Sequence, residues 1–293
     1  MIPHIWHRKG TLHLTYIEAF ILGLIQGLAE FLPISSSGHL AILQHFFEID
    51  GEKVLPFAVL LHVGTLISVF MVYWKDILAL FRELGATISD IISGKGLRLD
   101  SSPLRRLGAM IIVATIPTGI IGVLFNDLFA SMYLSLPWIA IGLFLTGILL
   151  FFAERKGKNT QATHQEEGIK VHHALFVGVF QGIAIWPGVS RSGSTLVGGL
   201  LSGLDRNVAI KFAFLISIPS ILGSVVMEAP DAFQEGLEAS LIGPILLGMA
   251  VAAVSGFLAI KTMLRVVAGK RLYWFSIYVW TLAAALLLYI VLN

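Results

Sequence analysis

The sequence predicts an all-α integral membrane protein in which six spanning helices and two re-entrant helical hairpins are arranged as inverted-topology repeats. Three observations predict this fold class: the overall hydrophobicity, six apolar stretches of spanning length, and a repeat between two interrupted apolar stretches. Hydrophobic residues make up 56% of the 293 residues, 13% are charged, and the mean hydropathy is +0.86. Soluble proteins carry about 25% charged residues, so most of this surface is expected to face membrane lipids.

Composition also excludes several classes of function. The formal net charge of +2 is too small to indicate a nucleic-acid partner. The chain has no cysteine, which excludes disulfides, thiolate chemistry and iron–sulfur or cysteine-ligated zinc sites. Residues 1–14 carry three histidines with Arg8 and Lys9 and lack an apolar run followed by small residues, so we expect no cleaved signal peptide.

Six apolar stretches are each close to the ~20 residues that a helix needs to cross about 30 Å of hydrocarbon. We therefore expect each of them to form a full membrane span. The six stretches are 54–74, 107–126, 135–153, 207–228, 241–261 and 272–292.

Two further apolar stretches, 17–47 and 172–204, are interrupted by proline, glycine and clustered serines. Irregular backbone at membrane depth is tolerated where it is buried in protein or lines a cavity, so we interpret both stretches as re-entrant hairpins. They are copies of each other, because a shift of 155 positions superposes them without a gap. The shift places Gly23, Gln26, Gly27, Ser35, Ser37 and Gly38 on Gly178, Gln181, Gly182, Ser190, Ser192 and Gly193.

The basic residues predict the orientation. Sixteen of the 20 Lys and Arg lie in segments that share one face if the first span ends in the cytoplasm, as the positive-inside rule requires. The first hairpin then enters from outside and the second from the cytoplasm. The cytoplasmic segments are 75–106, 154–172, 203–211 and 261–271.

This orientation makes the two halves inverted repeats within a single membrane domain, 1–293. The repeats cover approximately 17–153 and 172–292 and are joined by a cytoplasmic loop, 154–171. Inverted repeats of this kind place broken helices tip to tip near the bilayer midplane, with the functional site between them.

The first tip combines a carboxylate, hydroxyls and an imidazole. Gln26 and Glu30 are four residues apart and therefore share one helix face. Pro33 is expected to end that helix at the preceding residue. Residues 35–38 can then cap a new helix that includes His39, and the free N–H groups at its start form a site for an anion.

The second tip, 186–195, has the same plan with Arg191 in place of the central serine. A guanidinium at membrane depth needs an anion, and its planar fork of donors suits phosphate. Nearby hydroxyls extend this predicted phosphate cradle; they belong to Ser190, Ser192, Ser194 and Thr195.

Together the two tips contain the groups needed for phosphoryl transfer. Ser36 could be the nucleophile with His39 as its base, or His39 could activate water; Glu30 could hold a divalent cation or orient the histidine. In the span 54–74, His62 and Thr65 lie at helical spacing and could reach the cavity, although a hydrogen-bonded interhelical role is the expectation.

The motifs at 26–39 and 187–195 resemble those of the undecaprenyl-diphosphatase family, also known as bacitracin-resistance proteins, and the similarity extends over essentially the whole chain. The resemblance implies removal of the terminal phosphate from undecaprenyl diphosphate, which recycles the lipid carrier for peptidoglycan and other cell-wall glycans. It implies Ser36 as nucleophile, His39 as acid/base and Arg191 as diphosphate clamp, with Glu30 in the catalytic set. The substrate-binding residues that we predict are Gln26, Ser35, Ser37, Ser190, Ser192 and Thr195.

The family's first motif can offer two carboxylates to Mg²⁺ or Ca²⁺. Here the metal ligands would be Glu30 and Gln26, and Gln26 supplies only a neutral oxygen. The resemblance also implies a multi-pass protein of the inner (plasma) membrane whose site opens to the outer face. Its partners would be a polyprenyl diphosphate and membrane lipids, with a homodimer compatible with the sequence. The alternative function is a lipid-phosphate transporter or flippase, because inverted repeats with broken helices are common in secondary transporters.

Overall fold

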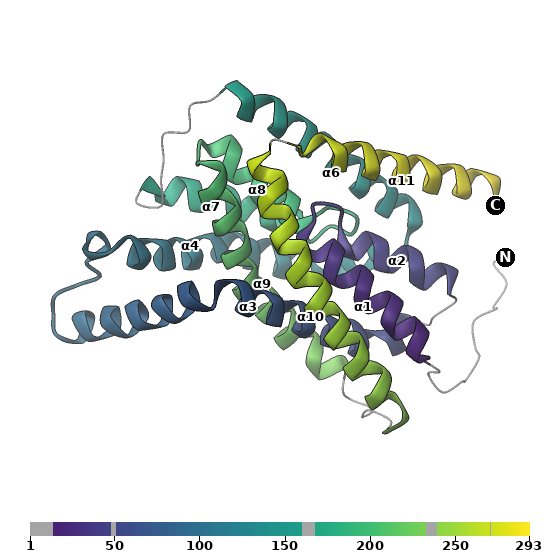
Figure 1. Cartoon of the computed structure of the whole chain (residues 1–293), viewed down its shortest axis with the longest axis horizontal. Coiled ribbons are helices and arrows are strands. Elements are labelled where there is room, and N and C mark those ends of the chain that lie inside the picture. Colours follow the sequence, from purple (N-terminus) through teal and green to yellow (C-terminus); the bar gives the residue numbers. More distant parts are fainter. Residues whose placement is uncertain (1–13, 48–50, 160–167, 233–238, 270) are drawn as a thin grey trace.

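The computed structural model describes residues 14–47, 51–159, 168–232, 239–269 and 271–293. Residues 1–13 lie outside this set, so our expectation that residues 1–14 are not a signal peptide concerns a segment of which only Leu14 is described. The described part is helical and contains no strand (Figure 1). Its elements are α1 (Tyr16–Phe31), α2 (Ser36–Phe46), α3 (Gly51–Ile92), the 3₁₀ turn η1 (Leu99–Ser101), α4 (Pro103–Leu124), α5 (Asn126–Tyr133), α6 (Leu136–Asn159), α7 (Val171–Ile183), α8 (Arg191–Ser202), α9 (Arg206–Ala232), α10 (Ala239–Ala268) and α11 (Tyr273–Leu292).

The six predicted spans are confirmed as six helices that are long and apolar enough to cross a membrane: α3, α4, α6, α9, α10 and α11. Several boundaries differ from the prediction, most of all at the ends of α3, α6 and α10, which runs to Ala268 where the predicted span ends at 261. Helix α3 has 42 residues and continues past a kink at Tyr73 to Ile92, so the predicted cytoplasmic segment 75–106 is largely helical. Helix α6 runs to Asn159, so the predicted connecting loop at 154–171 begins as helix.

Ion pairs explain why α3 continues beyond the span. Three acidic residues of α3 recur every seventh position and therefore share one face of the helix. Asp76 lies 2.7 Å from Lys211 of α9, while Glu83 and Asp90 lie 3.1 Å and 2.7 Å from Arg105 of α4. These pairs anchor the extension of α3 to its neighbours.

The two interrupted stretches each form a pair of short helices, as predicted. Helix α1 ends at Phe31, two residues before Pro33, and Ser35 caps α2 by accepting a hydrogen bond from Gly38 N at 3.2 Å. Ser190 caps α8 in the same way, from Gly193 N at 3.1 Å. The re-entrant position of these pairs in the bilayer stays a prediction.

Packing between the halves follows the sequence repeat. Helix α1 lies along α10, and its counterpart α7 lies along α4. A side chain at Gly23 would collide with the backbone of Gly248, and one at the equivalent Gly178 would collide with that of Ala114. These two equivalent glycines therefore allow α1 and α7 to approach their neighbours closely. Helices α6 and α11, which end the two halves, run side by side (Figure 1).

The largest buried apolar cluster lies beside the helix tips. It includes Phe31 at the end of α1 and the α9 residues Phe212 and Phe214. The rings of Phe31 and Phe214 meet edge to face, with centroids 5.8 Å apart. This packing fixes the end of α1 against the second half of the chain.

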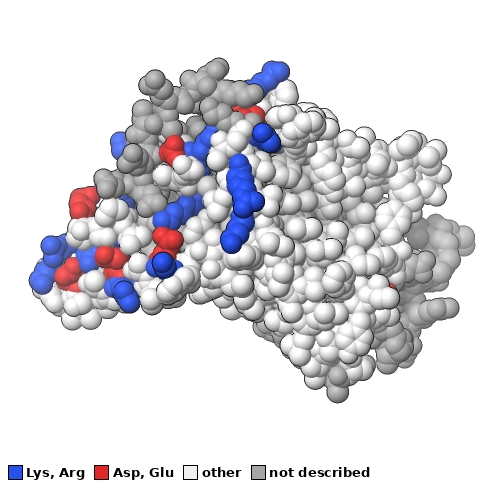
Figure 2. Space-filling model, viewed as in Figure 1, with Lys and Arg blue, Asp and Glu red and all other residues white. Residues whose placement is uncertain are grey.

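Charged side chains gather at one end of the molecule. In the view of Figure 2 they cover the end of α3 and the start of α4, whereas few of the described residues at the opposite end are charged. The C-terminus of α11 lies at this opposite end (Figure 1). The side of the membrane on which the charged end lies stays a prediction.

Candidate active site

The two interrupted segments meet at their tips. Gly188 N donates to Ser37 Oγ at 3.3 Å, and Ser192 Oγ donates to Leu32 O at 3.1 Å. These bonds join residues about 150 to 160 positions apart in the chain. The N-termini of α2 and α8 therefore lie together, as the repeat predicts.

The carboxylate of Glu30 is the centre of this junction. One oxygen, Oε1, is paired with the Arg191 guanidinium. The other, Oε2, accepts hydrogen bonds from Gln26 Nε2 at 3.0 Å and from Ser36 Oγ at 2.6 Å. Glu30 is only 5% exposed, and a carboxylate so buried needs a partner charge and hydrogen bonds. The structure thus brings together four of the residues that we predict at the site.

Arg191 is the first residue of α8 and reaches across to the first half. Besides Glu30 it contacts α9, donating to Ser217 O at 3.3 Å. A guanidinium has five N–H donors, and these contacts use two of them. Its side chain is 19% exposed, so the remaining donors can meet an anion.

Ser35 has an unusual backbone conformation, with φ of 72°. Few residues other than glycine adopt positive φ, which costs free energy of about 1–3 kcal/mol. Three hydrogen bonds hold it: Oγ accepts from Gly38 N and lies 3.2 Å from Ser37 Oγ, while the carbonyl bonds to His39. This conformation turns the chain sharply between α1 and α2.

The other predicted hydroxyl residues shape the second tip. Ser190 N donates to Thr146 Oγ1 at 2.9 Å, and Ser190 Oγ lies 3.3 Å from Ser192 Oγ. Thr195 Oγ1 donates to Arg191 O at 2.8 Å. In this structure these hydroxyls therefore support the tip, and their contact with substrate stays a prediction. Thr146 was not predicted, because it lies in α6 far along the chain from either motif.

His39 lies beside the junction but is not hydrogen-bonded to Ser36. Its Nδ1 is 2.8 Å from Ser35 O, and its Nε2 is 2.7 Å from the hydroxyl of Tyr278 in α11, whose ring stacks on the imidazole. Ser36 donates to Glu30 instead. The sequence left open a hydrogen-bonded Ser36–His39 pair, and the structure pairs both residues with other partners. Tyr278 could not be found from the sequence, since nothing near it resembles a motif.

His62 lies at the site. Its Nε2 is 4.0 Å from Glu30 Oε2, and its Nδ1 is 2.8 Å from Ala58 O, one turn earlier in α3. Thr65, its companion in the sequence, donates to His62 O at 2.8 Å and is fully buried. His62 therefore lies beside Glu30, whereas Thr65 is buried and bonds within its own helix, not between helices as expected.

The donors at the site can supply part of a divalent cation's coordination shell. Among the described residues, no group of three or more His, Asp or Glu side chains is close enough to hold a metal ion. Glu30 offers a carboxylate, and Gln26 Oε1 is a buried oxygen without a hydrogen-bond partner. Mg²⁺ is commonly held by one or two carboxylates together with substrate phosphates and water, so these two oxygens fit a cation that a diphosphate helps to bind.

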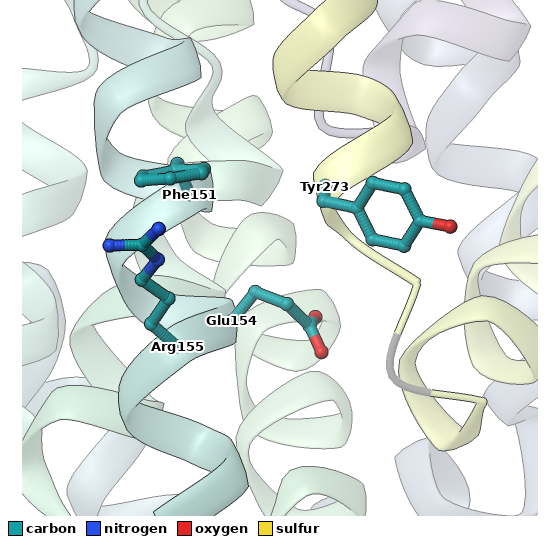
Figure 3. Close-up of a pocket in the computed structure, with 4 residues that line it drawn as sticks. All are labelled: Phe151, Glu154, Arg155 and Tyr273. Atoms are coloured by element: carbon teal, nitrogen blue, oxygen red, sulfur yellow. The ribbon is translucent and has the colours of Figure 1, made fainter.

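A cleft at the charged end of the molecule has a structural role. Figure 3 shows the four residues that line it, from the end of α6 and the start of α11. Glu154 is buried there; Oε2 accepts from Leu272 N at 3.1 Å, and Oε1 lies 3.7 Å from Arg206. Glu154 is eight residues beyond Thr146 in α6, or about 12 Å along the helix, so this cleft is separate from the junction. The lining residues are Phe151, Glu154, Arg155 and Tyr273.

Comparison with known proteins places this arrangement in a family. Residues 19–285 match the family described as bacitracin resistance protein BacA. The chain is 45% identical over 276 residues to the undecaprenyl-diphosphatase of Alkaliphilus metalliredigens, which covers 94% of this chain and 99% of that protein. It is 39% identical over 274 residues to the undecaprenyl-diphosphatase of Carboxydothermus hydrogenoformans, covering 92% and 95% of the two chains. With that of Halothermothrix orenii the identity is 40% over 263 residues, covering 90% and 93%.

Proposed function

Since the chain belongs to the family of bacitracin resistance protein BacA, we propose that it is a multi-pass membrane enzyme that hydrolyses undecaprenyl diphosphate to the monophosphate and inorganic phosphate. The observation that carries this function is the contact of Glu30 with Ser36 and Arg191 at the meeting point of the two tips. It unites a hydroxyl, a base and a cation, which are the groups that phosphoryl transfer requires. The comparisons do not support the alternative of a lipid-phosphate transporter or flippase.

Arg191 binds the diphosphate in the proposed mechanism. The donors that its contacts with Glu30 and Ser217 leave available can meet phosphate oxygens, and the N-termini of α2 and α8 add backbone N–H groups with their positive dipole ends. Charge that develops on the transferring phosphoryl group is stabilised best by such fixed donors in a site of low dielectric. The polyprenyl tail lies between helices in the membrane.

Ser36 attacks the terminal phosphorus in the first step. Its proton passes to Glu30 Oε2, to which it is already hydrogen-bonded at 2.6 Å. The bond between the terminal phosphorus and the bridging oxygen breaks, and the electron pair leaves on the lipid monophosphate. The family resemblance implies that His39 acts as an acid/base. It would do so through the hydroxyl of Tyr278, which lies 2.7 Å from its Nε2.

A divalent cation, Mg²⁺ or Ca²⁺, would be held by Glu30 and by Gln26 Oε1, with the diphosphate supplying further oxygens. When bound, it would neutralise phosphate charge beside Arg191. The support is the unpartnered, buried oxygen of Gln26 next to the only carboxylate at this junction among the described residues.

The enzyme is proposed to lie in the inner (plasma) membrane with its site open to the outer face. The support is the gathering of charged residues at the end predicted to be cytoplasmic, together with the positive-inside rule (Figure 2). A homodimer is compatible with this arrangement and can be tested by the mass of the detergent-solubilised protein.

The activity is tested with purified protein in detergent and a polyprenyl diphosphate. We expect release of inorganic phosphate and formation of the lipid monophosphate in equal amounts. Substrate that crosses a vesicle membrane without releasing phosphate would refute the enzyme and favour a transporter.

A further inference from the structure

We propose that His62 positions the water that hydrolyses phosphorylated Ser36 and accepts its proton, which makes His62 a catalytic residue of the second half of the reaction. The inference rests on the proposed function and extends it, because the contact between Ser36 and Glu30 accounts only for the first half. Four observations carry it. The His62 ring is held by a hydrogen bond within α3, its other nitrogen lies near Glu30, its side chain is partly exposed to solvent, and His39 is hydrogen-bonded to other partners.

The anchor fixes which nitrogen of His62 is free. Nδ1 lies 2.8 Å from the carbonyl oxygen of Ala58, which can only accept a hydrogen bond, so Nδ1 carries the proton. In the neutral ring Nε2 therefore has a lone pair and acts as an acceptor. This lone pair is on the side of the ring that faces Glu30.

Nε2 and Glu30 Oε2 are 4.0 Å apart. In the free enzyme both are acceptors and cannot bond to each other, but a water molecule that donates one hydrogen to each, at about 2.8 Å, spans this separation. Once Oε2 has taken the proton of Ser36, the water keeps its hydrogen bond to Nε2 alone. Such a water turns its own lone pairs away from both groups and toward the site. The His62 side chain is 28% exposed, against 3% for Glu30, so solvent reaches this pair from the side of the histidine.

The other histidine of the junction is not available for this task. Both nitrogens of His39 are within hydrogen-bond distance of other partners, Ser35 O and the hydroxyl of Tyr278. The charged groups near His62 are Glu30 from α1, with the cation that Glu30 would hold, and, behind it, Arg191 from α8. Helices α9 and α10, which pack on α3, carry no titratable side chain between 212 and 227 or between 240 and 260.

The second step then balances the first. The water oxygen attacks the phosphorus of phosphoserine 36, its proton goes to His62 Nε2, and the bond between phosphorus and Ser36 Oγ breaks. Ser36 Oγ recovers the proton held by Glu30, inorganic phosphate leaves, and His62 releases its proton to solvent. The sum of the two steps is hydrolysis of the diphosphate by one water, with the enzyme unchanged.

Two substitutions separate this role from a structural one. The amide of His62→Asn can keep the hydrogen bond to Ala58 O but has no atom at the position of Nε2. His62→Gln keeps a polar atom near Nε2 but cannot accept the proton. His45→Gln is the matched control, because His45 is exposed near the end of α2 and lies 3.4 Å from Tyr289, away from the junction.

The experiment is a rapid-quench reaction with a polyprenyl diphosphate labelled in its terminal phosphate. In both His62 variants we expect one lipid monophosphate per enzyme to form quickly, labelled protein to accumulate with the label on Ser36, and steady-state turnover to fall about 10²-fold. The wild type and His45→Gln should turn over without accumulating label. The inference is overturned if His62→Asn turns over at the wild-type rate, or if either folded variant slows without labelled Ser36. A wild type that releases no phosphate would instead refute the proposed function.

Discussion

Replacing Arg191 by alanine tests the role of its guanidinium in catalysis apart from its role in folding. In the free enzyme it is the partner of Glu30, which is 3% exposed at the side chain, and it also donates to Ser217 O. Removing one partner of a buried pair costs about 3–5 kcal/mol of stability. Arg191 is 19% exposed, so we expect the lower end of this range, ~3 kcal/mol. In the reaction, losing donors fixed on the phosphoryl charge in a dry site costs ~10²-fold in kcat/KM, about 3 kcal/mol.

Two further variants separate these costs. Arg206 is paired with buried Glu154 at 3.7 Å, at the charged end of the molecule; Arg206→Ala should lower the stability of the protein while the folded fraction keeps its kcat/KM. The double change Arg191→Ala with Glu30→Gln removes both charges and should recover stability but not activity. Thermal unfolding in detergent measures the first quantity, and phosphate release from a polyprenyl diphosphate measures the second. Phosphate release by Arg191→Ala within tenfold of the wild type would refute the assignment of Arg191 as the diphosphate clamp.

Three more predictions concern the nucleophile, the packing and the metal. Ser36→Ala should lower kcat by at least roughly 10³-fold, as loss of a nucleophile does, while Ser131→Ala on α5 should not; turnover near the wild-type value in the first variant would favour direct attack by water. Gly23→Ala places a Cβ against the backbone oxygen of Gly248 and should cost about 1–3 kcal/mol of stability. The control, Gly85→Ala, meets no atom within 4 Å and should be neutral or stabilising by up to ~1 kcal/mol. Equal melting temperatures of the two variants would contradict the packing argument. EDTA should abolish turnover, and Mg²⁺ or Ca²⁺ should restore it. Turnover that is unchanged by EDTA would disprove the requirement for a metal but not the phosphatase activity.

Local rules account for the parts of the site that could be predicted. A proline does not by itself end a helix here, since Pro117 and Pro244 lie inside α4 and α10. Pro33 is followed two residues later by a serine that accepts a backbone hydrogen bond at the start of a new helix, so the break after Phe31 and the caps at Ser35 and Ser190 follow from short stretches of sequence. The repeat then relates the two tips. The repeat and the predicted orientation placed Arg191 near Glu30, with phosphate as its expected partner, and in the structure it pairs with Glu30 itself.

Contacts between distant helices could not be predicted in the same way. Tyr278 bonds to His39 across 239 positions, and Thr146 bonds to Ser190 across 44. Such partners depend on the angle and depth at which two helices pack, which no local pattern records. The positive φ of Ser35 was not predicted either, because few residues other than glycine adopt it. Ser36 donates to Glu30, whereas the sequence left open a pairing of Ser36 with His39.

The pairing of Glu30 with Arg191 has a consequence for biogenesis. The two residues are 161 positions apart, so at a synthesis rate of about 5–20 residues per second Glu30 emerges roughly 8 to 32 s before its counter-ion. During that interval the first hairpin has a carboxyl group without its cation, and burying such a charge in hydrocarbon is costly. The first hairpin is therefore expected to complete its insertion only when the second half arrives, so that the nascent chain acquires its catalytic centre and its final topology in the same event.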